Sequence, residues 1–486
     1  MVNQINLRGV WLLLVSLGLG IVAEVCFFHG KIGISYIVFI VALYMVIFLH
    51  FQFAFYHRRI GMLLMVVIWL LAGSYLYLDS ILFYEINLVV IPLLIYCHLV
   101  LITTPDQYAW VSIEFVTILK EKCSQSVRYS LNACDELFKR VFKYNNKDMV
   151  IPIKPILIGL GIGIPLLLIV ITLLMSADKV FQELVLRVPN FIMQMNLLKE
   201  FWRIAIVLLV AFFFFGLFRV LPKKPSTREG ITGPQEKNWN GLTAVTILLM
   251  LLSVYLLFVC IQFSYFFGES LHSGYTFAEY ARKGFFELII VTLINWSILI
   301  SFMRFVQNTS VKLNRMLKIL YTLLIGLTSI MLISAYQRLS MYEEAYGYTL
   351  DRVLAHGFMI FLMVIFAYTL IRVWLTRLSL LHFYLIAGMI FYTGMNVINI
   401  EKLVTDKNLE RYEETGKIDI YYLNTLSYSG WNGLLQLYTK EPNYHGLEEL
   451  LIGRINQVQR NTEKSWQSFN FTRQKIEDKL DNLYVD

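Results

Sequence analysis

The sequence predicts an all-α membrane protein, a polytopic helix bundle of about eleven spans with a small helical tail at the C-terminal end. Hydrophobic residues make up 57% of the 486 residues and charged residues only 16%, whereas a typical soluble domain has roughly 25% charged residues. The mean hydropathy is +0.61, and the apolar residues gather in runs of about 20, the length that a spanning helix needs. This composition excludes a soluble enzyme, a disordered chain and a disulfide-rich secreted scaffold.

Eleven apolar runs are the expected spans. The first follows a single basic residue, Arg8, and no small-residue cleavage site comes after it, so we expect an uncleaved helix instead of a signal peptide. The runs cover residues 9–28, 34–56, 60–78, 81–103, 150–175, 201–221, 241–264, 284–304, 317–335, 355–375 and 379–400. Residues 1–400 are therefore the predicted transmembrane bundle.

The link at residues 104–149 has a helical period of its own. Apolar Val127, Leu131 and Phe138 recur at helical spacing, with basic Arg128 and Lys139 between them. This pattern predicts a basic amphipathic helix that lies on the cytoplasmic surface of the membrane.

Residues 401–486 form the second predicted region, a polar α-helical tail. It holds 11 Lys and Arg against 14 Asp and Glu, so the membrane part carries the whole positive excess of the chain. Helical stretches are expected at 419–437 and within 446–484, where Trp466, Ile476 and Leu480 contribute to an apolar stripe.

Lys and Arg are unevenly divided between the two sides of the predicted bundle. The N-terminus and the even-numbered links carry about 22 of them and the odd-numbered links about 9, which places the N-terminus in the cytoplasm. Eleven spans then place the C-terminal tail outside. The net charge of +8 is the ordinary cytoplasmic excess of a membrane protein, so we expect the bilayer as a partner and no nucleic acid.

Three polar stretches carry a family resemblance. They are Thr276–Ile289 with its core Tyr280–Phe285, then Arg338–Arg352, and last the tail segments Asp419–Ser427 and Trp466–Arg473. From about residue 80 onward the chain resembles an uncharacterised bacterial family of polytopic membrane proteins, domain of unknown function 4153 and 4173. The resemblance implies a many-helix protein of the bacterial cell membrane and implies no activity.

Polar residues in the outer third of the bilayer are the candidate site residues, because a charge at membrane depth costs about 3 kcal/mol or more. With the tyrosines and arginines expected in the external loops, they suggest a polar pocket that opens to the outside and holds a ligand or relays protons. The alternative is that these side chains reach the interface individually and that the tyrosines form an aromatic belt. The candidates near the outer ends of spans are Glu24, Glu85, Glu287, His356 and Asn396. Asn295 is expected deeper in the eighth span, and Tyr280, Arg282, Arg338 and Arg352 are expected in the external loops.

Motifs for metal, cofactor or nucleotide chemistry are not found. The five cysteines are dispersed, and the sequence has no C-x-x-C, H-E-x-x-H or P-loop pattern. We therefore expect no metal and no cofactor, and we lean against an enzyme.

Three functions stay open at this point. The first is a non-enzymatic role at the outer face, in which the protein binds or senses a ligand or assists envelope assembly, and the tail contacts an envelope or membrane protein. The second is a secondary transporter, which the proline- and glycine-containing spans favour. The third is a membrane-embedded enzyme that acts on a lipid-linked or cell-wall substrate, with Glu24 or Glu287 as acid or base.

Overall fold

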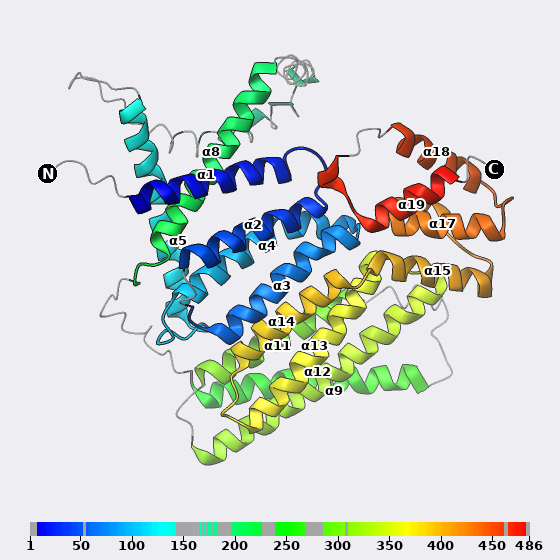
Figure 1. The fold of residues 1–486 in the computed structure, drawn as a ribbon. Coiled ribbons are helices and arrows are strands. Elements are labelled where there is room, and N and C mark those ends of the chain that lie inside the picture. Colours follow the sequence, from blue (N-terminus) through cyan, green and yellow to red (C-terminus); the bar gives the residue numbers. More distant parts are fainter. Residues whose placement is uncertain are drawn as a thin grey trace. The chain divides into compact units, whose positions relative to one another are not determined.

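The computed structural model shows an all-α protein over the residues that it describes (Figure 1). These are residues 7–51, 55–141, isolated positions between 159 and 182, and then 196–225, 239–267, 285–306, 310–460 and 465–482. They form two compact units. The first contains residues 1–76, 88–226 and 463–469, and the second contains 77–87, 227–462 and 470–486. The predicted division into a bundle of residues 1–400 and a tail of residues 401–486 stays a prediction.

Helices long and apolar enough to cross a membrane dominate the described chain. Nine helices meet this condition, and a tenth apolar helix, Ile34–Leu49, is slightly shorter. All ten correspond to predicted spans, and the remaining predicted span, 150–175, lies outside the continuously described residues. The prediction of a polytopic helix bundle is confirmed, and the chain is a multi-pass membrane protein.

The first unit contains a helical hairpin, two further spans, and a paired α5 and α8. Its helices are α1 (Leu7–Phe27), α2 (Ile34–Phe51), most of α3 (Arg58–Tyr77) and α4 (Ile81–Thr103), α5 (Ile113–Val141) and α8 (Asn196–Val220). Helix α1 packs closely on α8 at Gly20, where an added Cβ would lie 2.4 Å from the carbonyl oxygen of Val207. The glycine lets the two backbones approach each other.

Helix α5 is the amphipathic helix predicted within residues 104–149. It packs along α8, and Ser130 Oγ donates a hydrogen bond to the Phe212 carbonyl of α8 at 2.7 Å. Lys122 Nζ donates to the Leu221 carbonyl at 2.7 Å and to the Lys223 carbonyl at 3.1 Å. The Lys122 ammonium therefore satisfies carbonyls of the turn that directly follows α8. The surface position of this helix stays a prediction.

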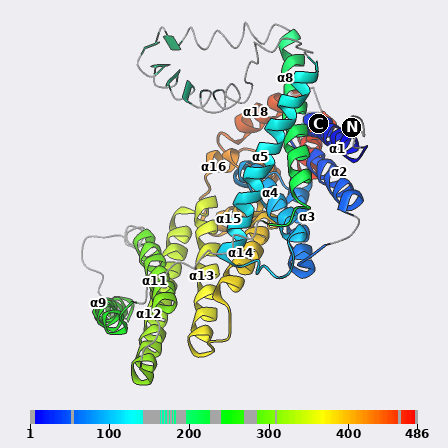
Figure 2. The ribbon, with the colours of Figure 1, turned by 90° about the vertical axis from the view of Figure 1, so that its left-hand side faces the viewer.

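The second unit contains five spans followed by the helices of the tail. They are α9 (Gly241–Phe267), α11 (Phe285–Phe305), α12 (Val311–Tyr346), α13 (Leu350–Trp374), α14 (Leu380–Val397), α15 (Ile400–Thr415), α16 (Ile420–Thr425), α17 (Tyr428–Lys440), α18 (Leu447–Arg460) and α19 (Phe471–Asn482). Helix α12 lies between α11 and α13 in Figure 2 and packs on both, and it also packs on α9. Leu248, Leu299, Leu324 and Phe366 are buried in the core that these four helices share.

Helix α12 is longer than the predicted span 317–335. It continues to Tyr346 and ends at Gly347, whose φ of +89° lies in the region that favours glycine. The extension forms because buried residues recur at helical spacing to its end, at Arg338, Leu339 and Glu343. The expectation that Arg338 and Arg352 lie in external loops is therefore wrong. Arg338 lies within α12, and Arg352 lies in the first turn of α13.

The tail helices share a hydrophobic core with the ends of the spans. Val404, Leu423, Leu434 and Leu480 are buried together with Phe83 of α4. Partly buried residues of α13 and α14 pack against the same core, among them Leu350, Val353, Tyr392 and Met395. The stretch predicted as one helix at 419–437 is two helices, α16 and α17. They meet where an added Cβ on Gly430 would lie 2.2 Å from the Leu423 carbonyl oxygen.

Polar side chains of the tail also hold the links between spans. Asn408 Nδ2 donates to the Tyr348 carbonyl at 2.8 Å, and its Oδ1 accepts from the Tyr348 N–H at 3.0 Å, in the link from α12 to α13. Asn470 Nδ2 donates to the Leu78 carbonyl at 2.9 Å in the link from α3 to α4. In the first unit, residues 465–469 form a short strap around the 3₁₀ turn Trp466–Ser468, and the Ile34 N–H donates to the Phe469 carbonyl at 3.0 Å.

Candidate functional site

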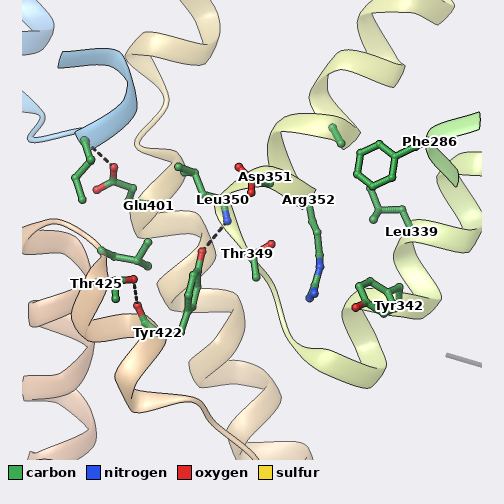
Figure 3. Close-up of a pocket in the computed structure, with 13 residues that line it drawn as sticks. Phe286, Leu339, Tyr342, Thr349, Leu350, Asp351, Arg352, Glu401, Tyr422 and Thr425 are labelled. Atoms are coloured by element: carbon green, nitrogen blue, oxygen red, sulfur yellow. Dashed lines mark hydrogen bonds between the residues drawn. The ribbon is translucent and has the colours of Figure 1, made fainter. Parts of the chain in front are cut away.

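A pocket of about 610 Å³ lies in the second unit where the spans end and the tail begins (Figure 3). We call it the junction pocket. It is lined by Ile81, Phe286, Leu339, Tyr342, Thr349, Leu350, Asp351, Arg352, Ala355, Glu401, Tyr422, Thr425 and Leu426. Small-molecule sites usually occupy roughly 300–1,000 Å³, so this volume is sufficient for a ligand.

The first turns of several helices surround the junction pocket. Ile81 is the first residue of α4, Phe286 is the second of α11, and Thr349 is the N-cap of α13. Three of these helices, α4, α11 and α13, are candidate spans. The pocket therefore lies at the level where apolar spans give way to polar structure. Asp351 and Glu401, in the first turns of α13 and α15, partly balance the positive ends of the helix dipoles.

Glu401 is a buried carboxylate in the wall of the junction pocket. Its Oε1 accepts a hydrogen bond from the Ile81 N–H at 2.9 Å, and its Oε2 accepts from the Ser427 N–H at 3.2 Å. Burial raises the pKa of Glu401 above the usual range for a carboxyl, and the hydrogen bonds from Ser427 and Ile81 oppose this shift. Glu401 therefore connects the start of α4 to the start of α17.

Arg352 is the cation among the lining residues. Its guanidinium lies over the ring of Tyr342, 4.3 Å from the ring centroid, and donates to the Gly347 carbonyl. Both contacts hold the side chain in place at the end of α12. A guanidinium has five N–H donors, so most of its donors are available to a ligand.

Tyr422 adds a hydroxyl to the pocket wall. Its oxygen accepts a hydrogen bond from the Leu350 N–H at 2.8 Å (Figure 3), which leaves its own proton to be donated. Burial raises the pKa of Tyr422, so the phenol is neutral at physiological pH. Thr349 contributes a second hydroxyl, which makes no capping hydrogen bond to α13.

A buried acid–base pair lies next to the pocket, on α12 and α13. Glu343 Oε2 is 3.0 Å from His356 Nε2, and both side chains are nearly inaccessible. The ring of Tyr336 packs edge-on against His356, with the centroids 4.2 Å apart. Arg338 is buried on the same helix as Glu343. Two predicted candidates, Arg338 and His356, thus lie close to the pocket without lining it.

The asparagine candidates form hydrogen-bonded links between spans. Asn396 Oδ1 accepts from Asn87 Nδ2 at 2.6 Å, and Asn87 Oδ1 accepts from the Tyr392 hydroxyl at 2.6 Å. Deeper in the bundle, Asn295 accepts from the Tyr255 hydroxyl at 2.7 Å and donates to Thr328 Oγ1 at 3.0 Å. Buried polar groups in such networks stabilise helix packing in membranes, so Asn396 and Asn295 have a structural role.

The carboxylate candidates Glu24, Glu85 and Glu287 are not among the residues that line the junction pocket. Glu24 belongs to the first unit, where its Oε1 is 2.9 Å from Arg203 Nε and 3.5 Å from His29 Nε2. Glu85 and Glu287 are exposed, the latter in the first turn of α11. Tyr280 and Arg282 lie outside the described residues. Of the eight candidates that the structure describes, Arg352 is the one that lines the junction pocket.

Several residues that line the junction pocket are not among the candidates predicted from the sequence. Glu401 follows directly after the last span, where a carboxylate normally faces water, and nothing in the local pattern indicates its burial. Asp351 belongs to the recognised stretch Arg338–Arg352, and Tyr422 to the stretch Asp419–Ser427. Residues of both stretches line the pocket. Membership in these stretches was therefore the sequence signal that could have identified Asp351 and Tyr422 as pocket residues.

The fold and the pocket define an all-α multi-pass membrane protein with a ligand-sized pocket at the boundary between its spans and its helical tail. The chain belongs to the family described as Domain of unknown function (DUF4153), whose model matches residues 65–437. The matched region contains every residue that lines the junction pocket. No curated protein and no solved structure matches the chain. The family predicted from the sequence is confirmed, and it assigns no activity.

Proposed function

We propose that this protein binds an amphipathic ligand in the junction pocket, at the outer face of a bacterial cell membrane, and acts as a non-enzymatic binding or sensing protein. The observation that carries the proposal is the composition of the pocket. Phe286, Leu339 and Leu426 give it apolar walls, whereas Asp351 and Arg352 give it a charged edge. A mostly apolar cavity with a few placed polar groups is the usual form of a small-molecule site.

The position of the pocket favours a ligand that comes from the bilayer. The pocket is lined by the first residues of spans α4, α11 and α13, so it lies where the hydrocarbon region meets the headgroup region. An amphipathic molecule in the membrane changes from apolar to polar at this same level. The polar part of such a ligand can lie close to Arg352 and Asp351 while the ligand stays at the boundary between hydrocarbon and headgroups.

The outer location rests on the charge asymmetry and on the contacts of the tail. Tail residues hydrogen-bond to the link from α3 to α4 and to the link from α12 to α13, and the strap hydrogen-bonds to the start of α2. In a count of eleven spans these are the third, ninth and first links, which all lie on the side of the tail. The excess of Lys and Arg on the opposite links then favours a cytoplasmic N-terminus and an external tail.

The tail is the proposed reporter of ligand binding. Glu401, Tyr422 and Thr425 belong to tail helices, and all three line the pocket together with residues of the spans. A bound ligand would therefore contact both the bundle and the tail. A change in the tail on binding would alter the surface that it presents to an envelope or membrane protein partner.

The test fills the pocket by substitution. Ala355→Trp places an indole in the pocket wall, and Ala367→Trp on the exposed face of the same helix is the matched control. We expect detergent-purified Ala355→Trp protein to retain its thermal stability and to lose co-purified amphiphile in mass spectrometry, whereas Ala367→Trp retains it. If both variants carry as much bound amphiphile as the unmodified protein, the proposal is wrong.

A further inference from the structure

We infer that the ligand of the junction pocket is a zwitterionic phospholipid with a primary ammonium, with its phosphate bound by Arg352 and its ammonium by Asp351. This inference rests on the proposed function and names the ligand class for that same site. It follows from the charges that line the pocket, from the partners that these charges already have, and from the apolar wall beside them.

Two charges of opposite sign are available to a ligand. Glu401 also lines the pocket, but each of its oxygens already accepts a backbone N–H, from Ile81 and from Ser427. Asp351 is exposed and makes no hydrogen bond or ion pair with any described residue. Arg352 is adjacent to it in the first turn of α13. A ligand with both a cation and an anion therefore matches the pair.

Arg352 is arranged to bind a phosphate. Its contact with the Tyr342 ring and its hydrogen bond to the Gly347 carbonyl fix the guanidinium, so little side-chain entropy remains to be lost on binding. The planar guanidinium donates two parallel hydrogen bonds to phosphate oxygens. The Tyr422 hydroxyl, which accepts from the Leu350 N–H, has a proton to donate to the same group or to an ester oxygen.

Asp351 selects the kind of ammonium. A primary ammonium donates three hydrogen bonds, so it pairs closely with a carboxylate. A trimethylated ammonium has no N–H donor and cannot make these bonds. An anionic headgroup without an ammonium would leave its negative charge next to Asp351 and Glu401, which is unfavourable at short range. Phosphatidylethanolamine has both the phosphate and the primary ammonium. Phosphatidylcholine has an ammonium without N–H donors, and phosphatidylglycerol has no ammonium.

The apolar wall accommodates the upper part of the lipid. Phe286, Leu339 and Ala355, of α11, α12 and α13, line the pocket. A volume of about 610 Å³ holds a headgroup, the glycerol and the first methylenes, and the rest of the chains lie outside along the exposed apolar surface of the spans.

The test titrates the full detergent-purified chain with three phospholipids of identical acyl chains and measures binding by native mass spectrometry. We expect phosphatidylethanolamine to bind about tenfold more tightly than phosphatidylcholine or phosphatidylglycerol. Asp351→Asn should reduce the affinity for phosphatidylethanolamine to that for phosphatidylcholine. Arg352→Gln should weaken binding of all three lipids about tenfold, as expected from the loss of a charge-assisted pair worth about 1.4 kcal/mol.

Two exposed residues outside the pocket provide matched controls, Glu344→Gln at the end of α12 and Arg377→Gln beyond α13. Both should leave the lipid preference unchanged, and Arg352→Lys should restore part of the affinity that Arg352→Gln loses. If phosphatidylglycerol binds as tightly as phosphatidylethanolamine and Ala355→Trp still abolishes binding, the headgroup inference is overturned and the proposed function stands. If no phospholipid binding responds to Ala355→Trp, the headgroup inference is overturned, and the proposed function is overturned as well if Ala355→Trp and Ala367→Trp carry as much co-purified amphiphile as the unmodified protein.

Discussion

Glu401 accepts a hydrogen bond from the backbone N–H of Ile81, which lies 320 residues earlier in the chain. Its second oxygen accepts from the N–H of Ser427, the N-cap of α17. One buried carboxylate thus satisfies N–H groups at the starts of a span and of a tail helix. It connects the tail to the bundle at the wall of the junction pocket.

Glu401→Gln should destabilise the attachment of the tail. A glutamine keeps one acceptor oxygen and turns an amide N–H₂ toward the other backbone N–H, so one buried donor loses its partner. We expect a loss of about 1–3 kcal/mol, measured as a lower unfolding temperature and as faster proteolysis of the tail in detergent. Glu410→Gln is the control, because it removes only an exposed ion pair with Lys407 that contributes at most about 1 kcal/mol. Equal unfolding temperatures for the two variants would contradict the role of Glu401.

The same carboxyl predicts a dependence of stability on pH. Because burial raises the pKa of Glu401 in the folded state, the folded protein binds more protons than the unfolded chain just above the ordinary carboxyl range. The contribution of this group to stability is therefore largest below that range and is lost as the pH rises through the folded pKa. The difference in unfolding temperature between the unmodified protein and Glu401→Gln should increase on acidification from pH 7 to pH 5. A difference that decreases on acidification would show that the pKa is lowered instead.

Two glycines of α1 provide a matched pair for the packing of the first unit. An added Cβ at Gly20 would lie 2.4 Å from the Val207 carbonyl oxygen, whereas an added Cβ at Gly18 meets nothing within 4 Å. Gly20→Ala should cost about 1–3 kcal/mol because the two backbones must separate. Gly18→Ala should be neutral or stabilise the helix slightly. Thermal unfolding of both variants measures the difference, and a stable Gly20→Ala protein would refute the close contact of α1 with α8.

Lys122 should be necessary for the pairing of α5 with α8. Lys122→Met removes the ammonium that donates to the carbonyls of Leu221 and Lys223, and we expect a loss of about 1–3 kcal/mol. Lys120 is exposed on the same helix, so Lys120→Met controls for the change of charge and should have an effect below about 0.5 kcal/mol. The unfolding temperatures of the two proteins are the measurement. A larger effect at Lys120 would argue against the capping role.

The proposed orientation predicts which links can be labelled from outside the cell. In a background without cysteines, Glu414→Cys in the tail should react with a membrane-impermeant maleimide in intact cells. Arg377→Cys, in the link between α13 and α14, should react only after the membrane is permeabilised. Both positions are exposed, so a difference reports the side of the membrane and not burial. The reverse pattern would place the tail in the cytoplasm and the junction pocket on the inner face.

The spans were predictable from sequence because their signal is local. A run of about 20 apolar residues has the same meaning wherever it occurs in the chain, and ten of the eleven predicted runs are helices here. The end of α12 was not predictable in this way. The stretch from Arg338 to Tyr346 is too polar for a hydropathy criterion, and it is helical because its inner face packs in the bundle.

The junction pocket was less predictable because it depends on distant pairs. Arg352 was recognised from its place in a charged, tyrosine-rich stretch. Glu401 was not, since its burial requires both Ile81 and Ser427 as neighbours. Glu24 lies near the end of α1, and its contact with Arg203 of α8 joins residues that are 179 positions apart in the sequence. Such relationships are properties of the fold, and hydropathy contains no information about them.

The strap at residues 465–469 has a consequence for how the protein is made. The Ile34 N–H pairs with the Phe469 carbonyl, and the Gln467 amide donates to the Val25 carbonyl across 442 residues of sequence. The turn between α1 and α2 therefore cannot form these hydrogen bonds until residues 465–469 have been synthesised. A chain that stops before residue 465 leaves the Ile34 N–H and the Val25 carbonyl without these partners. A segment more than 400 residues later in the sequence thus completes the hairpin of α1 and α2.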